Sequence, residues 1–153
     1  MSTALAGHVK WIHRFLLQWI DRVPEDRLLE RVKGQANCAL WNAGHIAASR
    51  RAMARQLDLD LGSPDWLSHF GMGADGTPSE DWPSLPVIAE DLKQTAQALS
   101  AFLKDVSSEF MAEEIPHHLS DGQVPREENL LFLLYHEGFH AGQIELARRL
   151  LDD

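Results

Sequence analysis

The stretch His136-Glu137-Gly138-Phe139-His140-Ala141-Gly142-Gln143-Ile144 lies within a long apolar segment that we predict to be a helix from about Pro125 to Leu151. Three- and four-residue steps along this helix place on one face Phe132, His136, His140, Gln143 and Ala147. Two imidazoles one turn apart on one face are how a single helix presents two nitrogen ligands to a divalent metal. The segment therefore predicts both a long helix and part of a metal site.

Three further segments show helical periodicity, and no segment of any length alternates strictly between apolar and polar residues. The predicted helices run from about residue 3 to Asp21, from Cys38 to Leu57, and from Ser84 to about Val106. A long loop before the third of them is rich in glycine and proline, and a second irregular stretch covers Glu109 to Val124. Four amphipathic helices in one small domain predict an all-α fold, a four-helix bundle with a long loop between helices two and three.

A third imidazole, His45, lies in the alanine-rich second helix, on a face that also carries Cys38, Trp41, Ala48 and Ala52. We expect this face and that of His136 and His140 to point into the bundle, where facing helices build metal sites. Three neutral imidazoles and a water form the ligand set of an open zinc site. Imidazole also suits nickel, copper, iron and cobalt, so the ligand type does not name the metal.

A structural interpretation of these histidines is also open, because a histidine on an apolar face is usually a hydrogen-bonded core residue. The chain has eight histidines, which raises the chance of accidental spacing. We predict surface or structural positions for His8, His13, His69, His117 and His118. Glycines flank the three candidate ligands at Gly44, Gly138 and Gly142, which indicates close helix approach or space kept for a ligand. Cys38 could approach the site, although such a cysteine is more often a small buried hydrophobe.

The string from His136 to His140 also matches the H-E-x-x-H pattern of zinc peptidases. A peptidase needs a third protein ligand, and no histidine or suitably placed glutamate follows His140. No strand is predicted that could bind an extended peptide, so we expect no peptidase activity. Glu137 is the candidate catalytic residue, accepting a hydrogen bond from a ligand imidazole or from metal-bound water. Alternatively, Glu137 has no catalytic role, and its carboxylate lies on the flank of the helix, where it is solvated or accepts a hydrogen bond from an N–H group.

Composition limits the classes of function. The 153 residues suit one domain, residues 1–153, with 44% hydrophobic and 24% charged residues. The formal net charge of −9 argues against nucleic acid or an anionic membrane as a partner. One cysteine excludes an intrachain disulfide, and no apolar run is long enough to span a bilayer. The N-terminus lacks the pattern of a signal peptide, so we expect a cytoplasmic location.

The two histidine segments, Trp41-Asn42-Ala43-Gly44-His45-Ile46-Ala47 and residues 136–144, resemble those of the DinB/YfiT-like family of small metal-binding four-helix bundles. The resemblance covers most of the chain in helix order and spacing. It implies a three-histidine site for a divalent cation, carried by His45, His136 and His140. It also implies frequent homodimers. Some members of the family are thiol-dependent transferases or isomerases that use bacillithiol, mycothiol or glutathione.

The leading hypothesis is a metal-dependent enzyme for a small-molecule substrate, with zinc or nickel as the metal and a low-molecular-weight thiol as a further cofactor. The alternatives are a non-catalytic metal-binding or stress-response module, and a metal-dependent hydrolase with Glu137 as base. The aromatic residues Trp66, Phe70 and Trp82 of the long loop are predicted to wall the substrate pocket, or else to pack over the end of the bundle. We expect a homodimer, because one inward stripe cannot bury all the large apolar residues of the first helix, which include Trp11, Phe15, Leu17 and Trp19.

Overall fold

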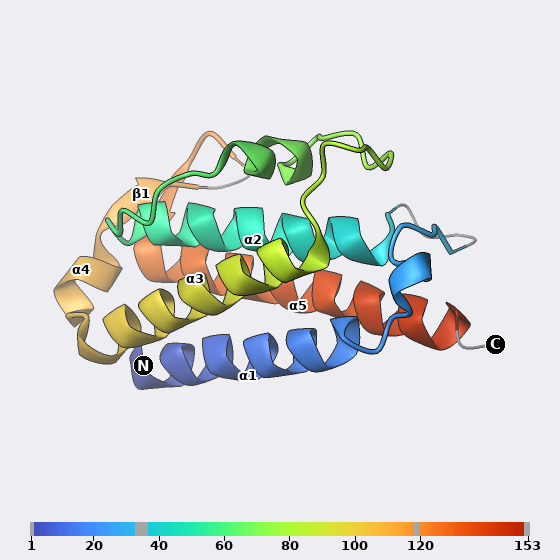
Figure 1. Ribbon diagram of the computed structural model, residues 1–153. Coiled ribbons are helices and arrows are strands. Elements are labelled where there is room, and N and C mark those ends of the chain that lie inside the picture. Colours follow the sequence, from blue (N-terminus) through green and yellow to red (C-terminus); the bar gives the residue numbers. More distant parts are fainter. Residues whose placement is uncertain (1, 33–36, 118–119, 152–153) are drawn as a thin grey trace.

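Four long helices lie side by side in the computed structural model, which describes residues 2–32, 37–117 and 120–151 (Figure 1). They are α1 (Ser2–Ile20), α2 (Ala39–Gln56), α3 (Leu85–Asp105) and α5 (Arg126–Leu151). Helices α1 and α2 each pack mainly against α3 and α5, so the first two helices occupy diagonal positions in the bundle. The predicted all-α four-helix bundle is confirmed, and the order of the helices around it is not sequential.

The connections contain short elements: η1 (Glu25–Arg27), η2 (Asp65–Phe70), α4 (Ser108–Ala112), β1 (Glu114–Pro116) and β2 (Gln123–Pro125). The prediction that the chain contains no strand is wrong, because β1 and β2 form an antiparallel pair with Ile115 opposite Val124. Each strand has only three residues, which is too short for an alternating pattern to appear in the sequence. His118, which we predicted to be structural or on the surface, lies outside the described residues.

Helix α2 is buried on almost every side, because α3 and α5 flank it and the η2 segment covers part of it. Phe70, at the end of η2, is fully buried in the same apolar cluster as Ile46 and Ala47 of α2. The loop between α2 and α3 is therefore packed onto the bundle, as its aromatic residues led us to expect. No helix among the described residues has the length and apolar character needed to cross a membrane.

A buried polar network at the centre of the bundle joins all four long helices. Arg50 of α2 is fully buried and donates from Nε to Glu137 Oε1 of α5 at 2.9 Å. Its Nη1 donates to the carbonyl oxygen of Leu92 in α3 at 2.7 Å, and it lies 3.1 Å from His13 Nδ1 of α1. Burial, together with the nearby Arg50 charge, lowers the pKa of His13 to about 4. The network fixes how the four helices are rotated relative to one another.

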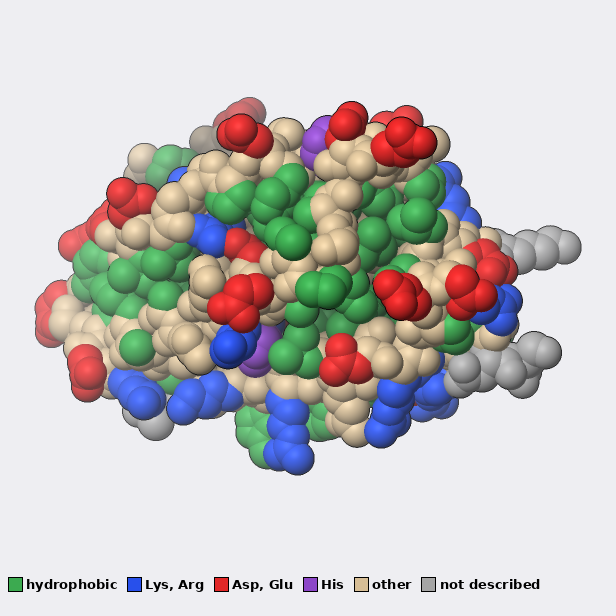
Figure 2. Space-filling model, viewed as in Figure 1, with side chains coloured by type: hydrophobic (Ala, Val, Ile, Leu, Met, Phe, Trp, Pro, Cys, Tyr) green, Lys and Arg blue, Asp and Glu red, His purple; other side chains and the backbone are tan. Residues whose placement is uncertain are grey.

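Charged side chains are unevenly distributed on the face of the molecule seen in Figure 2. Asp and Glu side chains gather along the upper edge, over the segment that contains η2, and Lys and Arg side chains line the lower edge along α1. On this face, the edge over η2 is therefore mainly acidic, in line with the net charge of −9.

Candidate metal centre

The three predicted ligands converge at one point between α2 and α5. Nε2 of His136 lies 3.4 Å from Nε2 of His45 and 3.1 Å from Nε2 of His140. Among the described residues, these three histidines form the group whose ligand atoms all lie within 4.8 Å of one another. The i, i+4 pair of α5 therefore meets the single histidine of α2, as the sequence predicted.

Hydrogen bonds at the other ring nitrogen set the tautomers of two of these imidazoles. Nδ1 of His45 lies 2.6 Å from the backbone oxygen of Phe70, which can only accept, so Nδ1 carries the proton. Nδ1 of His140 lies 2.9 Å from Asn42 Oδ1 and 2.9 Å from Gln143 Oε1. The Asn42 amide is oriented in turn, because its Nδ2 donates to the Cys38 carbonyl at 3.1 Å. Both rings thus turn an Nε2 lone pair toward the centre of the cluster.

This geometry fits a bound divalent cation. Zn–N bonds of about 2.0–2.1 Å with tetrahedral angles place ligand nitrogens roughly 3.4 Å apart, and the observed separations are 3.1 and 3.4 Å. Burial, followed by the electrostatic influence of the neighbouring His45 and His136 rings, lowers the pKa of His140 to about 4. His140 is therefore neutral at pH 7, which is the form that binds metal, and a cation would offset the repulsion between facing lone pairs.

An open pocket of about 820 Å³ lies over the cluster, between α2, α5 and the η2 segment. Its mainly apolar wall includes Trp41, Ala48 and Ala52 from α2, Phe132 from α5, and Leu67 and Met72 from the η2 segment. Trp41 stacks on the His45 ring with centroids 4.7 Å apart and 11° between the planes, which fixes the orientation of that imidazole. All three histidines line the pocket, so a small molecule that enters it reaches their Nε2 atoms.

Glu137 does not join the histidines. Its carboxylate is fully buried and pairs with Arg50 in the centre of the bundle, and it does not line the pocket. A residue next to His136 in a helix points about 100° away from it, so Glu137 faces the core while His136 faces the pocket. This geometry supports its interpretation as an N–H-bonded carboxylate, and we assign it a structural position instead of the predicted catalytic one.

For the loop aromatics and for Cys38, the structure supports the second of the two interpretations that the sequence left open. Phe70 is fully buried, and Trp66 and Trp82 pack against the core, so the loop aromatics cover the bundle while neighbouring loop residues wall the pocket. Cys38 is buried in the same apolar cluster and lies outside the histidine group and the pocket lining. Burial raises the pKa of its thiol, as expected for a small buried hydrophobe.

The site also depends on residues that the sequence analysis did not single out as partners of the histidines. Gln143 follows His140 by three residues on the same helix face. This spacing alone could have identified Gln143 as a hydrogen-bond partner of His140 from the sequence. Asn42 and the backbone oxygen of Phe70 come from distant parts of the chain, and no local pattern connects them to His140 or His45. These three groups accept hydrogen bonds from the Nδ1 atoms, on the ring edges that face away from the cluster. They thereby hold the Nε2 atoms in place.

Comparison with known proteins gives a family and a fold. The sequence model of the DinB superfamily matches residues 9–144. The structure is similar to the crystal structure of a conserved protein from Enterococcus faecalis, with a TM-score of 0.69 and 13% sequence identity over 98% of this chain and 96% of the other. At that identity the likeness concerns the fold alone. No curated protein matches the sequence.

Proposed function

Because the chain belongs to the DinB superfamily and gathers three imidazoles beneath an open pocket, we propose that it is a divalent-metal enzyme of the thiol-dependent transferase or isomerase type. The observation that carries this proposal is the position of the three Nε2 atoms at the wall of a pocket large enough for a small molecule. Structural metal sites are closed by a fourth protein ligand, whereas catalytic sites keep a position open. Among the described residues, no further Cys, Asp or Glu joins the group.

The histidines and the aromatic residues that line the pocket have different roles in the proposed reaction. His45, His136 and His140 hold the ion, with zinc or nickel as the best candidates for three nitrogen ligands. When bound, the ion supplies a Lewis acid that lowers the pKa of a ligating thiol and keeps it as thiolate. Trp41 and Phe132 border the histidines with aromatic surface, which limits water at the reacting sulfur and packs against the substrate.

Metal content is the first test. We expect purified protein to carry about one divalent ion per chain, held by three nitrogens with positions left for water. Elemental analysis of wild type and His140→Ala compares the site with and without one ligand, and His69→Ala serves as control because His69 does not line the pocket. Equal metal content in wild type and His140→Ala would remove His140 from the site.

Thiol binding is the second test. Cobalt-substituted protein is titrated with glutathione, bacillithiol, mycothiol and cysteine while the thiolate-to-metal charge-transfer band is recorded. A band with any of them supports the transferase proposal, and its strength should rise with pH because coordination releases the thiol proton. Metal binding without a band for any thiol favours the non-catalytic module. Cleavage of casein by the loaded protein would favour a peptidase.

A further inference from the structure

Two arginines of α2 line the pocket beyond the histidines, and they differ in what they contact. Arg51 and Arg55 lie one turn apart and belong to the part of the helix that follows His45. Arg51 is buried, whereas Arg55 is exposed. The difference in their partners decides which of them is available to a ligand.

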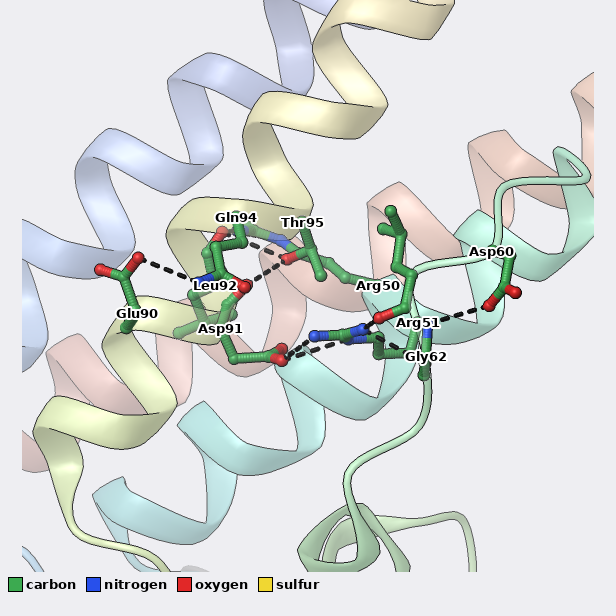
Figure 3. A network of polar contacts seen from close by, with 10 residues as sticks. Arg50, Arg51, Asp60, Gly62, Glu90, Asp91, Leu92, Gln94 and Thr95 are labelled. Atoms are coloured by element: carbon green, nitrogen blue, oxygen red, sulfur yellow. Dashed lines mark hydrogen bonds and ion pairs between the residues drawn. The ribbon is translucent and has the colours of Figure 1, made fainter.

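All three nitrogens of the Arg51 guanidinium donate hydrogen bonds within the protein (Figure 3). Its Nε donates to Asp91 Oδ1 of α3 at 3.1 Å, and Nη2 donates to the same oxygen. Its Nη1 donates to the carbonyl oxygen of Leu61 and, at 3.2 Å, to that of Gly62. Arg51 thus ties α2 to α3 and to the start of the loop, and its charge is neutralised by Asp91.

The guanidinium of Arg55 makes no hydrogen bond or ion pair with any residue that the structure describes. It continues the face of α2 that carries Trp41, His45 and Ala52, at the same three- and four-residue steps. Asp65 borders the pocket from η2, but its carboxylate forms no ion pair with Arg55. A pocket in a chain of net charge −9 therefore contains an arginine whose guanidinium forms no ion pair with any described residue.

The separation between Arg55 and the histidines sets the size of the ligand. Ten residues of α2 separate His45 from Arg55, which is about 15 Å along the axis at 1.5 Å per residue. Arginine side chains on a helix point back toward its N-terminus, so the guanidinium lies nearer to the histidines by several ångströms. An extended molecule with its metal-binding atom at His45 and its far end at Arg55 is therefore about 10 Å long.

We infer that the ligand of this pocket carries an anionic group, such as a carboxylate, about 10 Å from its metal-binding atom, and that Arg55 binds that group. This inference rests on the proposed function, because it needs a ligand bound at the three histidines. Arginine suits the role because its planar fork matches a carboxylate with two parallel hydrogen bonds. The apolar wall formed by Ala48, Ala52 and Phe132 lies between the two ends, so the middle of the ligand is mainly apolar.

Two hydroxamates that differ only at the far end test this inference without any thiol. Suberic acid monohydroxamate and octanohydroxamic acid have the same metal-binding group and chain length, but only the first ends in a carboxylate. Their binding to cobalt-substituted protein is followed by the cobalt absorption spectrum, for wild type, Arg55→Gln and Arg55→Lys. Arg14→Gln is the matched control, since exposed Arg14 of α1 does not line the pocket and its loss changes the net charge equally.

In wild type we expect the carboxylate-bearing hydroxamate to bind more tightly than the alkyl one. Arg55→Gln should weaken its binding about tenfold, with little change for octanohydroxamic acid. Arg55→Lys should keep part of the affinity, Arg14→Gln should keep all of it, and Asp65→Asn should raise it. Equal effects of Arg55→Gln on both hydroxamates, or no binding of either by protein that retains cobalt, would overturn the inference. A missing thiol band with this hydroxamate pattern intact would overturn only the thiol proposal.

Discussion

Gly44 lies so close to the ring of Phe70 that a Cβ at this position would come within 2.6 Å of Phe70 Cγ and 2.7 Å of Cε1. The absence of a side chain therefore lets the η2 segment pack directly on α2. That contact brings the backbone oxygen of Phe70 to 2.6 Å from His45 Nδ1. The glycine before His45 is thus linked to the orientation of the metal ligand that follows it.

Gly44→Ala should disturb the site although alanine favours helices by about 1 kcal/mol over glycine. Phe70 is fully buried and cannot turn aside freely, so the methyl group should displace η2 and the Phe70 carbonyl. Loss of a hydrogen bond to a ligating histidine typically lowers metal affinity by about 10–100-fold. Competition with a chromophoric chelator measures this directly.

Gly142→Ala is the matched control for that substitution. Gly142 lies two residues after His140 on α5, and a Cβ there would meet no atom within 4 Å. We expect unchanged metal affinity and a gain of about 0.5–1 kcal/mol in the free energy of unfolding. Equal metal affinity in both glycine variants would contradict the role assigned to the contact between Gly44 and Phe70.

The sequence predicted the histidine cluster because helical spacing and the shared faces of two helices depend only on local periodicity. It could not predict the partner of Glu137, since Arg50 lies 87 residues away and belongs to a different helix. A local signal did exist, because Glu137 shares a face with Leu133, Ala141 and Ile144, all of which are buried. That face points into the core, while the histidine face points to the pocket. The hairpin of β1 and β2 depends on pairing across a turn, for which three-residue strands leave no pattern.

Arg50→Met should destabilise the fold strongly, because it leaves Glu137 buried and without its partner. Removal of one member of a buried ion pair typically costs about 3–5 kcal/mol, which urea denaturation of the metal-free protein can measure. The double variant Arg50→Met/Glu137→Leu should recover most of that loss, since no buried charge remains. Lys93→Met, which breaks an exposed pair with Glu90, should change stability by less than about 0.5 kcal/mol. Comparable small effects of Lys93→Met and Arg50→Met would contradict the central network.

His13 should make the stability of the protein depend on pH. Burial, followed by the Arg50 charge, lowers its pKa in the folded state from 6.5 to about 4. Between these two values the unfolded chain binds more protons than the folded one, so the free energy of unfolding should fall as the pH drops through that window. His13→Gln should flatten this dependence, because glutamine does not titrate but can still accept from Arg50.

The comparison of His13→Gln with wild type is made by urea denaturation at several pH values with a chelator present. Under that condition His140, whose pKa is also lowered to about 4, contributes equally to both proteins and cancels in the difference. His8→Gln is the control, since His8 is exposed on the same helix. Parallel stability curves for wild type and His13→Gln would show that His13 does not contribute.

Large apolar side chains remain exposed along two neighbouring helices, and we propose that they form a homodimer interface. On α5 these residues recur at steps of four or seven, which keeps them on one face of the helix, and comprise Leu131, Tyr135, Phe139, Leu146 and Leu150. On α1, Trp11 is 58% exposed and stacks on Phe15, with ring centroids 5.6 Å apart. The sequence predicted a surface on the first helix or its neighbours; Leu17 and Trp19 pack against the core, and the row on α5 lies on a neighbouring helix.

The two rows should act as one surface, because α1 and α5 pack against each other and Gly138 of α5 approaches Ile12 of α1. Exposed apolar patches of this extent in a small protein usually mark an interface. Light scattering at micromolar concentration should therefore give twice the chain mass of 17.2 kDa.

Trp11→Glu and Leu146→Glu should each shift the protein toward the monomer, because each places a charge in the contact. Val87→Glu on α3, which changes an equally exposed apolar residue away from these rows, should leave the dimer intact. A wild-type mass of one chain, or dissociation by Val87→Glu alone, would rule out this interface.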